Sequence, residues 1–194
     1  MRYTDLLKIK GLYFSGRDLA DCLDIDYASA RVTCSRYAKL GLIVRLKRNF
    51  YMLRQRWDNL KTPEEFLVAN ILQVPSYISL LSALSYYDVS TQVQRGFVES
   101  ISVRRTKSVS IEDRQFNFYK IKKTYYNNFV KKDGFFIATP EKALLDCIYL
   151  AAFGKYTLDT SAVDFDKINK GIFAKLIRRY PSRVQRLGGR LWKA

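Results

Sequence analysis

Residues 27–53 read YASARVTCSRYAKLGLIVRLKRNFYML, a stretch with many cationic side chains and no carboxylate. Its first half has the apolar period of an amphipathic helix from Tyr27 to Leu40. Its second half has two β-branched or aromatic runs, Leu42–Leu46 and Phe50–Leu53, on either side of the basic turn Lys47-Arg48-Asn49. Because short runs of this kind around a tight turn favour a β-hairpin, the stretch predicts a helix followed directly by a hairpin.

The residues before this stretch predict two further helices. One runs from Tyr3 to Lys10, and the other runs from Gly16 to Leu23, where Ser15 can cap the first turn. The residues Asp24-Ile25-Asp26 then form a short polar turn. Helix, helix, turn, helix and hairpin is the order of a winged helix-turn-helix, so we expect a domain of this type at residues 1–60.

The rest of the chain, residues 61–194, predicts an α+β domain with a small β-sheet. Alternating apolar residues indicate three strands, at Phe97–Arg104, Arg114–Lys122 and Gly134–Ala138. Helical patterns cover Pro63–Leu72, Pro75–Tyr87, Pro140–Phe153 and Asp164–Arg179, and a last one resumes briefly between Pro181 and Gly188. The fold class is therefore α+β, with an N-terminal winged helix-turn-helix and a mixed C-terminal domain.

The chain carries 34 lysines and arginines against 18 aspartates and glutamates, a formal net charge of +16. This balance favours an acidic partner, which is nucleic acid, an anionic membrane surface or an acidic protein. No apolar run approaches the roughly 20 residues that a membrane span needs. The N-terminus, MRYTDLLKIK, has charges where a signal peptide has apolar residues. We therefore expect a cytoplasmic protein that does not enter a membrane.

The residue types that serve catalysis and metal binding are scarce. Histidine is absent, which removes the commonest metal ligand and general base near neutral pH. The cysteines Cys22, Cys34 and Cys147 are widely spaced among apolar residues, as buried thiols are. Asp24 and Asp26 lack the glycine-serine loop of a nucleotidyltransferase, and the chain has no P-loop or GxGxxG motif. We expect no catalytic activity, no metal and no cofactor.

The predicted helix at Tyr27–Leu40 has two chemically different faces on a helical wheel. The inner face holds Ala30, Thr33, Cys34, Tyr37, Ala38 and Leu40, and the outer face holds Ser29, Arg31, Val32, Ser35, Arg36 and Lys39. Short polar and basic side chains contact base edges and phosphates in the major groove, and a valine contacts thymine methyl groups. Together with a basic hairpin tip that reaches the backbone or the minor groove, this predicts DNA contacts from Tyr27, Ser29, Arg31, Val32, Ser35, Arg36, Lys39, Arg45, Lys47, Arg48 and Asn49.

These basic segments have other interpretations. A solvated helix and hairpin in a winged helix that binds another protein has the same pattern. A second acid-free run, from Lys167 to the C-terminus, contains nine lysines and arginines. It predicts a second basic surface that binds RNA, DNA or an acidic protein, or that is simply solvated, and its residues are Lys175, Arg178, Arg179, Arg183, Arg186 and Arg190.

Three segments resemble the AbiEi-type antitoxins of type IV toxin–antitoxin (abortive infection) systems. The first is Lys39-Leu40-Gly41-Leu42-Ile43 followed by Arg45–Leu53, which is similar to the leucine-glycine turn and R-G-x-Y wing of that family. Asn49 stands where the family has glycine, and asparagine is the next best residue for a positive φ. The other segments are Ser79–Tyr87 (SLLSALSYY) and Ala138–Asp146 (ATPEKALLD), and the latter is the more specific.

The resemblance implies a transcriptional regulator with two functions. The N-terminal domain would bind operator inverted repeats in double-stranded DNA and act as repressor of its own operon. The C-terminal domain would counter a nucleotidyltransferase-like toxin, with or without direct contact. By their own pattern, residues 138–146 form a well-capped helix with Ala143, Leu144 and Cys147 in the core, and so mark the fold. The alternative function is a stand-alone winged-helix transcriptional regulator whose C-terminal domain senses a ligand or forms a dimer.

Overall fold

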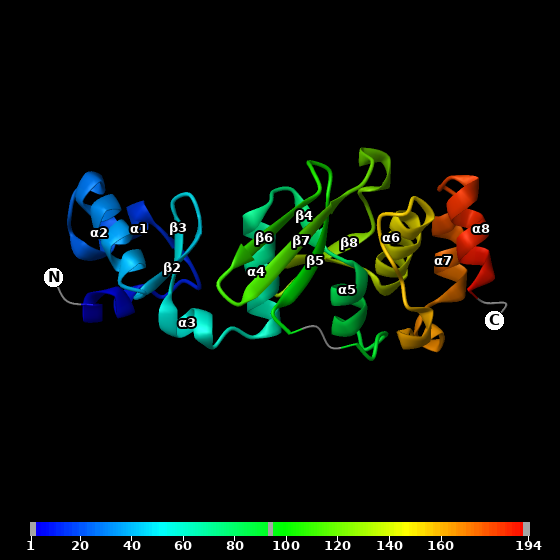
Figure 1. Cartoon of the computed structure of the whole chain (residues 1–194), viewed down its shortest axis with the longest axis horizontal. Coiled ribbons are helices and arrows are strands. Elements are labelled where there is room, and N and C mark those ends of the chain that lie inside the picture. Colours follow the sequence, from blue (N-terminus) through cyan, green and yellow to red (C-terminus); the bar gives the residue numbers. More distant parts are fainter. Residues whose placement is uncertain (1–2, 93–94, 192–194) are drawn as a thin grey trace. The chain divides into compact units, whose positions relative to one another are not determined.

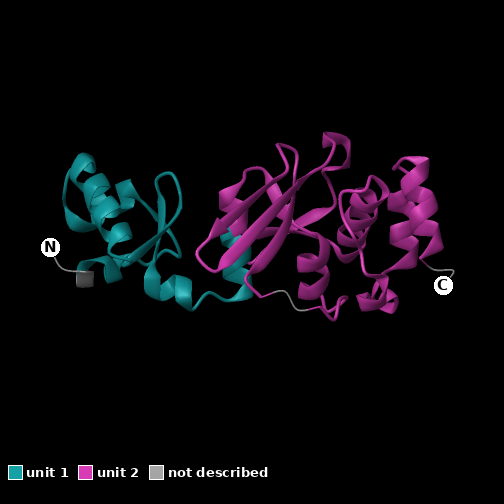
Figure 2. Ribbon diagram, viewed as in Figure 1, with its two compact units in different colours: residues 1–68 teal, residues 69–194 magenta. Residues whose placement is uncertain are grey.

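The computed structural model describes residues 3–92 and 95–191, which form eight α-helices, four 3-10 helices and two β-sheets (Figure 1). The predicted α+β class is therefore confirmed. The chain divides into two compact units, residues 1–68 and 69–194, and the division falls within helix α4 (Thr62–Leu72) (Figure 2). No helix in the described ranges has the length and apolar character that crossing a membrane requires.

Unit 1 contains two α-helices followed by a hairpin, in the predicted order. Its elements are η1 (Tyr3–Lys8), β1 (Phe14–Ser15), α1 (Gly16–Leu23), α2 (Tyr27–Lys39), β2 (Ile43–Lys47), β3 (Phe50–Leu53), α3 (Arg54–Asp58) and the first part of α4. The first segment is a 3-10 helix and ends two residues before the predicted boundary at Lys10. Helix α3 lies where the sequence shows no clear periodicity, and it buries Trp57.

The helices of unit 1 are fixed by their caps and by one shared core. At α1, the Ser15 hydroxyl accepts a hydrogen bond from the Asp18 amide, and the Asp18 carboxylate accepts one from the Ser15 amide. This reciprocal capping satisfies amide groups that the first turn leaves without helical partners. The core beneath the helices joins residues from every element up to β3, namely Leu6, Phe14, Leu19, Ala30, Cys34, Ile43 and Leu53.

The hairpin of unit 1 belongs to a three-stranded antiparallel sheet of order β1-β3-β2. Arg45 pairs with Tyr51 across the two long strands, and the register shifts between Arg45 and Lys47. At the tip, Asn49 has a φ of 62°, so the predicted left-handed conformation is confirmed. The hairpin therefore keeps its tight turn without a glycine at this position.

Unit 2 is built on a six-stranded mixed sheet of order β6-β7-β5-β4-β9-β8. The strands are β4 (Ser76–Ile78), β5 (Phe97–Ser102), β6 (Lys107–Ile111), β7 (Arg114–Lys120), β8 (Phe129–Lys132) and β9 (Phe135–Ala138). The pairs β5–β7 and β4–β9 are parallel, and the remaining pairs are antiparallel. The sheet has six strands, twice the number predicted, because the sequence pattern does not indicate β4, β6 and β8.

The predicted helix at Pro75–Tyr87 is wrong over its first part. Residues Ser76–Ile78 form the central strand β4, and all three are buried. A strand that is covered on both faces shows no alternation of polar and apolar residues, so its pattern does not distinguish it from a buried helix. The helix itself is α5 (Leu80–Tyr86), and it begins at Leu80, whose φ is 56°. The edge strands β6 and β8 were missed because they are short and polar.

The remaining helices of unit 2 are α6 (Pro140–Ala152), α7 (Lys170–Ile177) and α8 (Ser182–Arg190), with 3-10 turns η2 (Lys123–Tyr125), η3 (Thr160–Ala162) and η4 (Phe165–Lys167). Helix α6 packs against α5, α7 and α8. As predicted, Thr139 caps α6, and the residues Ala143, Leu144 and Cys147 are fully buried.

Two helical boundaries near the C-terminus differ from the predictions. The helix predicted from Asp164 begins only at Lys170, since Asp164 instead caps the short turn η4. The last helix does not end before Gly188 but continues to Arg190. At Gly188 an added Cβ would collide with Ile177 of α7. This glycine therefore allows two helices to pack closely, and it does not terminate one.

Candidate nucleic-acid interface

The outer face of α2 is exposed as the helical wheel predicts. Ser29, Arg31, Val32, Ser35, Arg36 and Lys39 are all exposed, while Ala30, Thr33, Cys34 and Tyr37 are buried. The prediction is wrong for Leu40, which is predicted on the inner face but is 64% exposed. The helix ends at Lys39, and Leu40 is its C-cap. The exposed face thus presents cationic and small polar side chains around one large apolar residue, Val32.

The start of α2 is held by the carboxylate of Asp26. This carboxylate accepts hydrogen bonds from the Ser29 amide at 3.0 Å and from the Ser29 hydroxyl at 2.5 Å, and these bonds lower the pKa of Asp26. Asp24 is the C-cap of α1 and has a left-handed conformation. Asp24 therefore caps the end of α1, and Asp26 caps the start of α2. The Ser29 hydroxyl, predicted to contact DNA, donates its proton within the cap.

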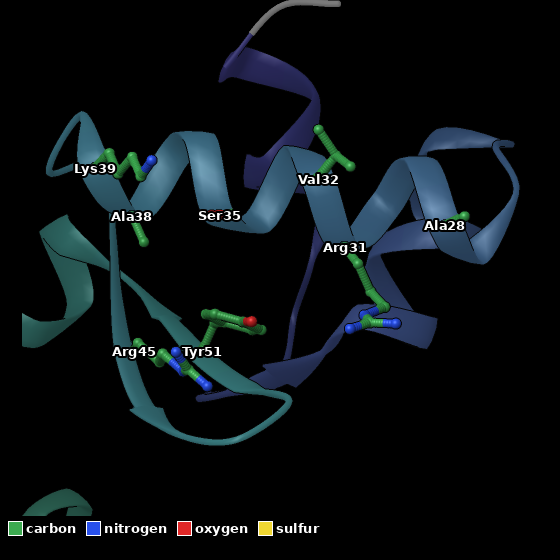
Figure 3. Close-up of a pocket in the computed structure, with 8 residues that line it drawn as sticks. All are labelled: Ala28, Arg31, Val32, Ser35, Ala38, Lys39, Arg45 and Tyr51. Atoms are coloured by element: carbon green, nitrogen blue, oxygen red, sulfur yellow. The ribbon is translucent and has the colours of Figure 1, made fainter.

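A groove of about 770 Å³ separates α2 from the hairpin. Its walls are Ala28, Arg31, Val32, Ser35, Ala38 and Lys39 from α2, and Arg45 and Tyr51 from the hairpin (Figure 3). In Figure 3, Arg31 extends from α2 toward the hairpin, where Arg45 and Tyr51 project from neighbouring strands. The groove therefore brings together cations from α2 and from the hairpin.

Tyr51 is a further residue of this groove and is not among the residues predicted to contact DNA. It is half-buried, and burial raises the pKa of its phenol, while the nearby Arg45 and Arg31 guanidiniums act in the opposite direction. A hydroxyl beside two guanidiniums adds a hydrogen-bond donor for a phosphate oxygen. The pairing of the two strands indicates Tyr51 as a groove residue, because it lies directly across from Arg45.

The hairpin tip is tied to the helices of unit 1. The Asn49 side-chain oxygen accepts a hydrogen bond from the Gly16 amide at 3.0 Å and one from the Tyr27 hydroxyl at 3.4 Å. A Cβ at Gly16 would lie 2.8 Å from the same Asn49 oxygen, so only glycine allows this approach. Asn49 and Tyr27, both predicted to contact DNA, therefore also fix the hairpin relative to α1 and α2.

The other two residues of the tip are cations. The Lys47 ammonium lies 4.5 Å from the centre of the Phe50 ring, and burial lowers its pKa. Arg48 is exposed. The tip thus presents positive charge on a turn whose backbone is held in place by Asn49.

Five cations of this surface are exposed without an ion-pair partner among the described residues. In the described part of the chain, no carboxylate lies within ion-pair distance of Arg31, Arg36, Lys39, Arg45 or Arg48. Arg54 and Arg56, which follow the stretch of residues 27–53 and precede the next carboxylate at Asp58, behave differently. Arg54 donates to the Gly41 carbonyl and contacts Asp58, and Arg56 donates to the carbonyls of Ile9 and Gly11. The cations of this region therefore separate into exposed cations and cations that hold the fold.

The predicted second basic surface also separates into two groups. All six of its residues are exposed. Arg183, Arg186 and Arg190 line a groove of about 290 Å³ between α8 and the end of α6. The other three residues, Lys175, Arg178 and Arg179, lie on or just after α7 and do not line this groove.

The segment Ala138–Asp146 contains an ion pair that the sequence analysis did not predict. Lys142 and Asp146 are fully buried and paired, and the Asp146 carboxylate also accepts hydrogen bonds from the hydroxyls of Tyr77 at 2.9 Å and Ser79 at 2.8 Å. The Lys142 ammonium donates to the Tyr180 hydroxyl at 3.2 Å. The cluster joins β4, the start of α5, α6 and the α7–α8 turn, and none of its charge reaches solvent.

Burial opposes the charged form of both groups in this pair. It lowers the pKa of Lys142 and raises the pKa of Asp146, and in each case the attraction of the partner acts against the shift. Tyr77, which donates to this carboxylate, has a pKa well above its usual value for the same reason. This arrangement is a structural cluster that holds unit 2 together.

No protein-family model and no curated protein sequence matches the chain. Among solved structures, the chain is similar to the crystal structure of the RV2827C protein from Mycobacterium tuberculosis, with a TM-score of 0.63 and 8% sequence identity. The match covers 97% of this chain and 74% of that one. At this identity the likeness shows a shared fold alone.

Proposed function

We propose that the chain is a DNA-binding antitoxin of a type IV toxin–antitoxin system, with a winged helix-turn-helix in unit 1. The observation that carries the DNA-binding half is the exposed face of α2, where Arg31, Arg36 and Lys39 lie beside small polar groups and no carboxylate among the described residues is within ion-pair distance of them. Positive charge that is not neutralised by a carboxylate is suited to phosphates. The antitoxin half rests on the resemblance of three sequence segments to AbiEi-type proteins.

The geometry of unit 1 suits insertion of α2 into the major groove. The helix has 13 residues and is therefore about 20 Å long. Arg31 and Arg36 lie on its outer face and would donate to base edges, while Val32 would contact thymine methyl groups. Lys39 and Arg45, at one end of the groove in Figure 3, would contact a phosphate strand. The tip cations Lys47 and Arg48 would reach the backbone or the minor groove beside it.

Unit 2 is proposed to counter a nucleotidyltransferase-like toxin and to have no enzymatic activity of its own. The buried Lys142–Asp146 pair of this unit is closed to solvent and belongs to the fold. Repression of its own operon by unit 1 would then link the amounts of antitoxin and toxin. If unit 2 does not counter a toxin, the chain is a stand-alone transcriptional regulator.

The DNA-binding half is tested by measuring affinity for the inverted repeat upstream of the chain's own gene. A random duplex of equal length is the comparison, and both are titrated over a range of salt concentrations. We expect specific binding that weakens steeply with salt, since phosphate contacts release counterions. Equal affinity for the two duplexes would overturn the operator-binding proposal. Lys10→Ala is the control for substitutions of the cations in α2 and the hairpin, because Lys10 is exposed and lies outside the groove.

The antitoxin half has a separate test in cells. The gene immediately downstream is expressed with and without this chain, and growth is scored. We expect toxicity that the chain relieves. Absence of relief would overturn the antitoxin half and leave operator binding untouched.

A further inference from the structure

The groove between α8 and α6 in unit 2 has a chemistry that operator binding by unit 1 does not use. Its walls are Arg183, Arg186, Leu187 and Arg190 from α8, and Ala151 and Ala152 from the last turn of α6. The arginines are three and four residues apart, so they lie on one face of the helix over about 10 Å. The sequence from Lys167 onward contains no carboxylate.

The arginine face of α8 is built into the fold. On the opposite side of the helix Val184 is fully buried, and Gly188 packs against Ile177 and Phe173 of α7. The Gln185 side-chain nitrogen Nε2 donates to the Tyr180 carbonyl at 2.7 Å and to the Arg178 carbonyl at 3.3 Å. These contacts fix the rotation of α8 and keep its arginines turned toward α6.

An exposed aromatic ring lies beside Arg183, the first of these arginines. Phe153, the C-cap of α6, is 42% exposed, and the Arg183 guanidinium carbon lies 5.9 Å from the centre of its ring. Tyr149 also packs against this ring, with 5.2 Å between the ring centres. An aromatic ring next to arginines on a concave surface is the arrangement that stacks an unpaired base while the cations contact the strand's phosphates.

We propose that this groove binds single-stranded RNA. The phosphates would contact Arg183, Arg186 and Arg190, and a base would stack on Phe153. A duplex keeps its bases stacked on each other and has no face to offer the ring. The carbonyl oxygens of Leu150 and Ala151 accept from backbone amides after α6, and a ribose 2′-hydroxyl, which DNA lacks, would donate to the carbonyl oxygen of the neighbouring groove residue Ala152. An acidic peptide would use the arginines but would gain nothing specific from the exposed ring.

The test uses the full chain and a labelled oligouridylate of about ten nucleotides, with fluorescence anisotropy as the readout. The triple variant Arg183→Ala, Arg186→Ala and Arg190→Ala should weaken binding about tenfold or more and lower the salt slope by about 2, because single strands lose about 0.7 for each phosphate contact. The matched control removes the same charge from α7 through Lys175→Ala, Arg178→Ala and Arg179→Ala. It should keep most of the affinity. Thermal unfolding of both triples checks that they are folded.

A second variant separates stacking from charge. Phe153→Leu keeps an apolar side chain and all the arginines, and we expect about fivefold weaker binding or more with an unchanged salt slope. Oligothymidylate of equal length should bind more weakly than the RNA. Polyglutamate should fail to displace the RNA at equal charge concentration.

Four results would overturn the proposal. They are equal losses in the two triple variants, no loss in Phe153→Leu, equal affinity for RNA and DNA, or displacement by polyglutamate, which would indicate an acidic protein as the partner. The proposal is independent of operator binding, and the same variants separate the two. The α8 triple should leave operator affinity intact, while Lys47→Ala with Arg48→Ala should leave RNA affinity intact.

Discussion

Helices α2 and α6 each have 13 residues, and both carry cations, but they use them in opposite ways. On α2 the cations Arg31, Arg36 and Lys39 are exposed to solvent. On α6 the Lys142 ammonium is completely enclosed and is surrounded by Asp146, Tyr180 and the ring of Tyr77. The same residue class therefore forms a binding surface in one unit and an internal joint in the other.

The difference follows from the cost of removing a charge from water. An exposed guanidinium keeps its hydration and needs no partner, so it can meet a phosphate of another molecule. A buried ammonium loses its hydration and is tolerated only where a carboxylate and further hydrogen bonds replace the water. Mutating the two kinds of cation should accordingly change different properties, namely binding for α2 and stability for α6.

The largest expected effect is on the buried pair. Asp146→Asn keeps an oxygen that accepts from Tyr77 and Ser79 but leaves the Lys142 charge without its partner. We expect a loss of about 3–5 kcal/mol in the free energy of unfolding of unit 2, measured by urea denaturation.

The control for this variant is an exposed pair with the same spacing. Arg54 and Asp58 are four residues apart, with 3.7 Å between the charged groups, and both are partly exposed. Asp58→Asn should cost only about 0.3–0.5 kcal/mol. Similar losses in the two variants would show that burial of the Lys142–Asp146 pair contributes nothing special.

The second effect is on the α2 surface. Arg31→Ala and Arg36→Ala should each weaken operator binding by about 1–3 kcal/mol if the residue contacts a base, and sequence preference at the contacted position should relax. Both side chains are exposed, so the thermal unfolding midpoint should stay unchanged. Loss of folding stability in either variant would contradict the division between binding and structural cations.

The third effect extends the comparison to the hairpin. Changing Lys47 and Arg48 together to alanine should weaken binding to all duplexes alike and lower the salt slope by about 2, because each phosphate contact contributes about 0.9. Operator and random duplexes are titrated in parallel. Loss of sequence preference with an unchanged slope would show that the tip does not contact the backbone.

The last prediction concerns Asn49, whose side chain holds the hairpin in place and is also predicted to contact DNA. Asn49→Ala loses the hydrogen bonds to Gly16 and Tyr27 and must also adopt a φ near 62°, so unit 1 should lose about 2 kcal/mol of stability. Asn49→Gly restores the residue of the AbiEi-type wing and keeps the turn, at a cost of about 1 kcal/mol. Urea unfolding checks the order of the two variants. If both are as stable as the parent and bind the operator less well, Asn49 contacts DNA and does not anchor the hairpin.

The sequence by itself determined most of unit 1. The bounds of α1, the buried and exposed faces of α2, the hairpin and the positive φ of Asn49 all follow from caps, apolar periods and turn residues within a few positions of each other. Such signals act locally, so they do not depend on where the rest of the chain lies.

Only the tertiary structure decided which side chains meet. Asp146 receives a hydrogen bond from Tyr77, 69 residues away, and Asn49 receives one from the Gly16 amide, 33 residues away. The burial of β4, the burial of the Lys142–Asp146 pair and the arginine groove beside Phe153 also depend on segments that fold together from distant parts of the chain. Burial determines whether a charge or an apolar run is structural or available for binding, and burial is a property of the packed molecule.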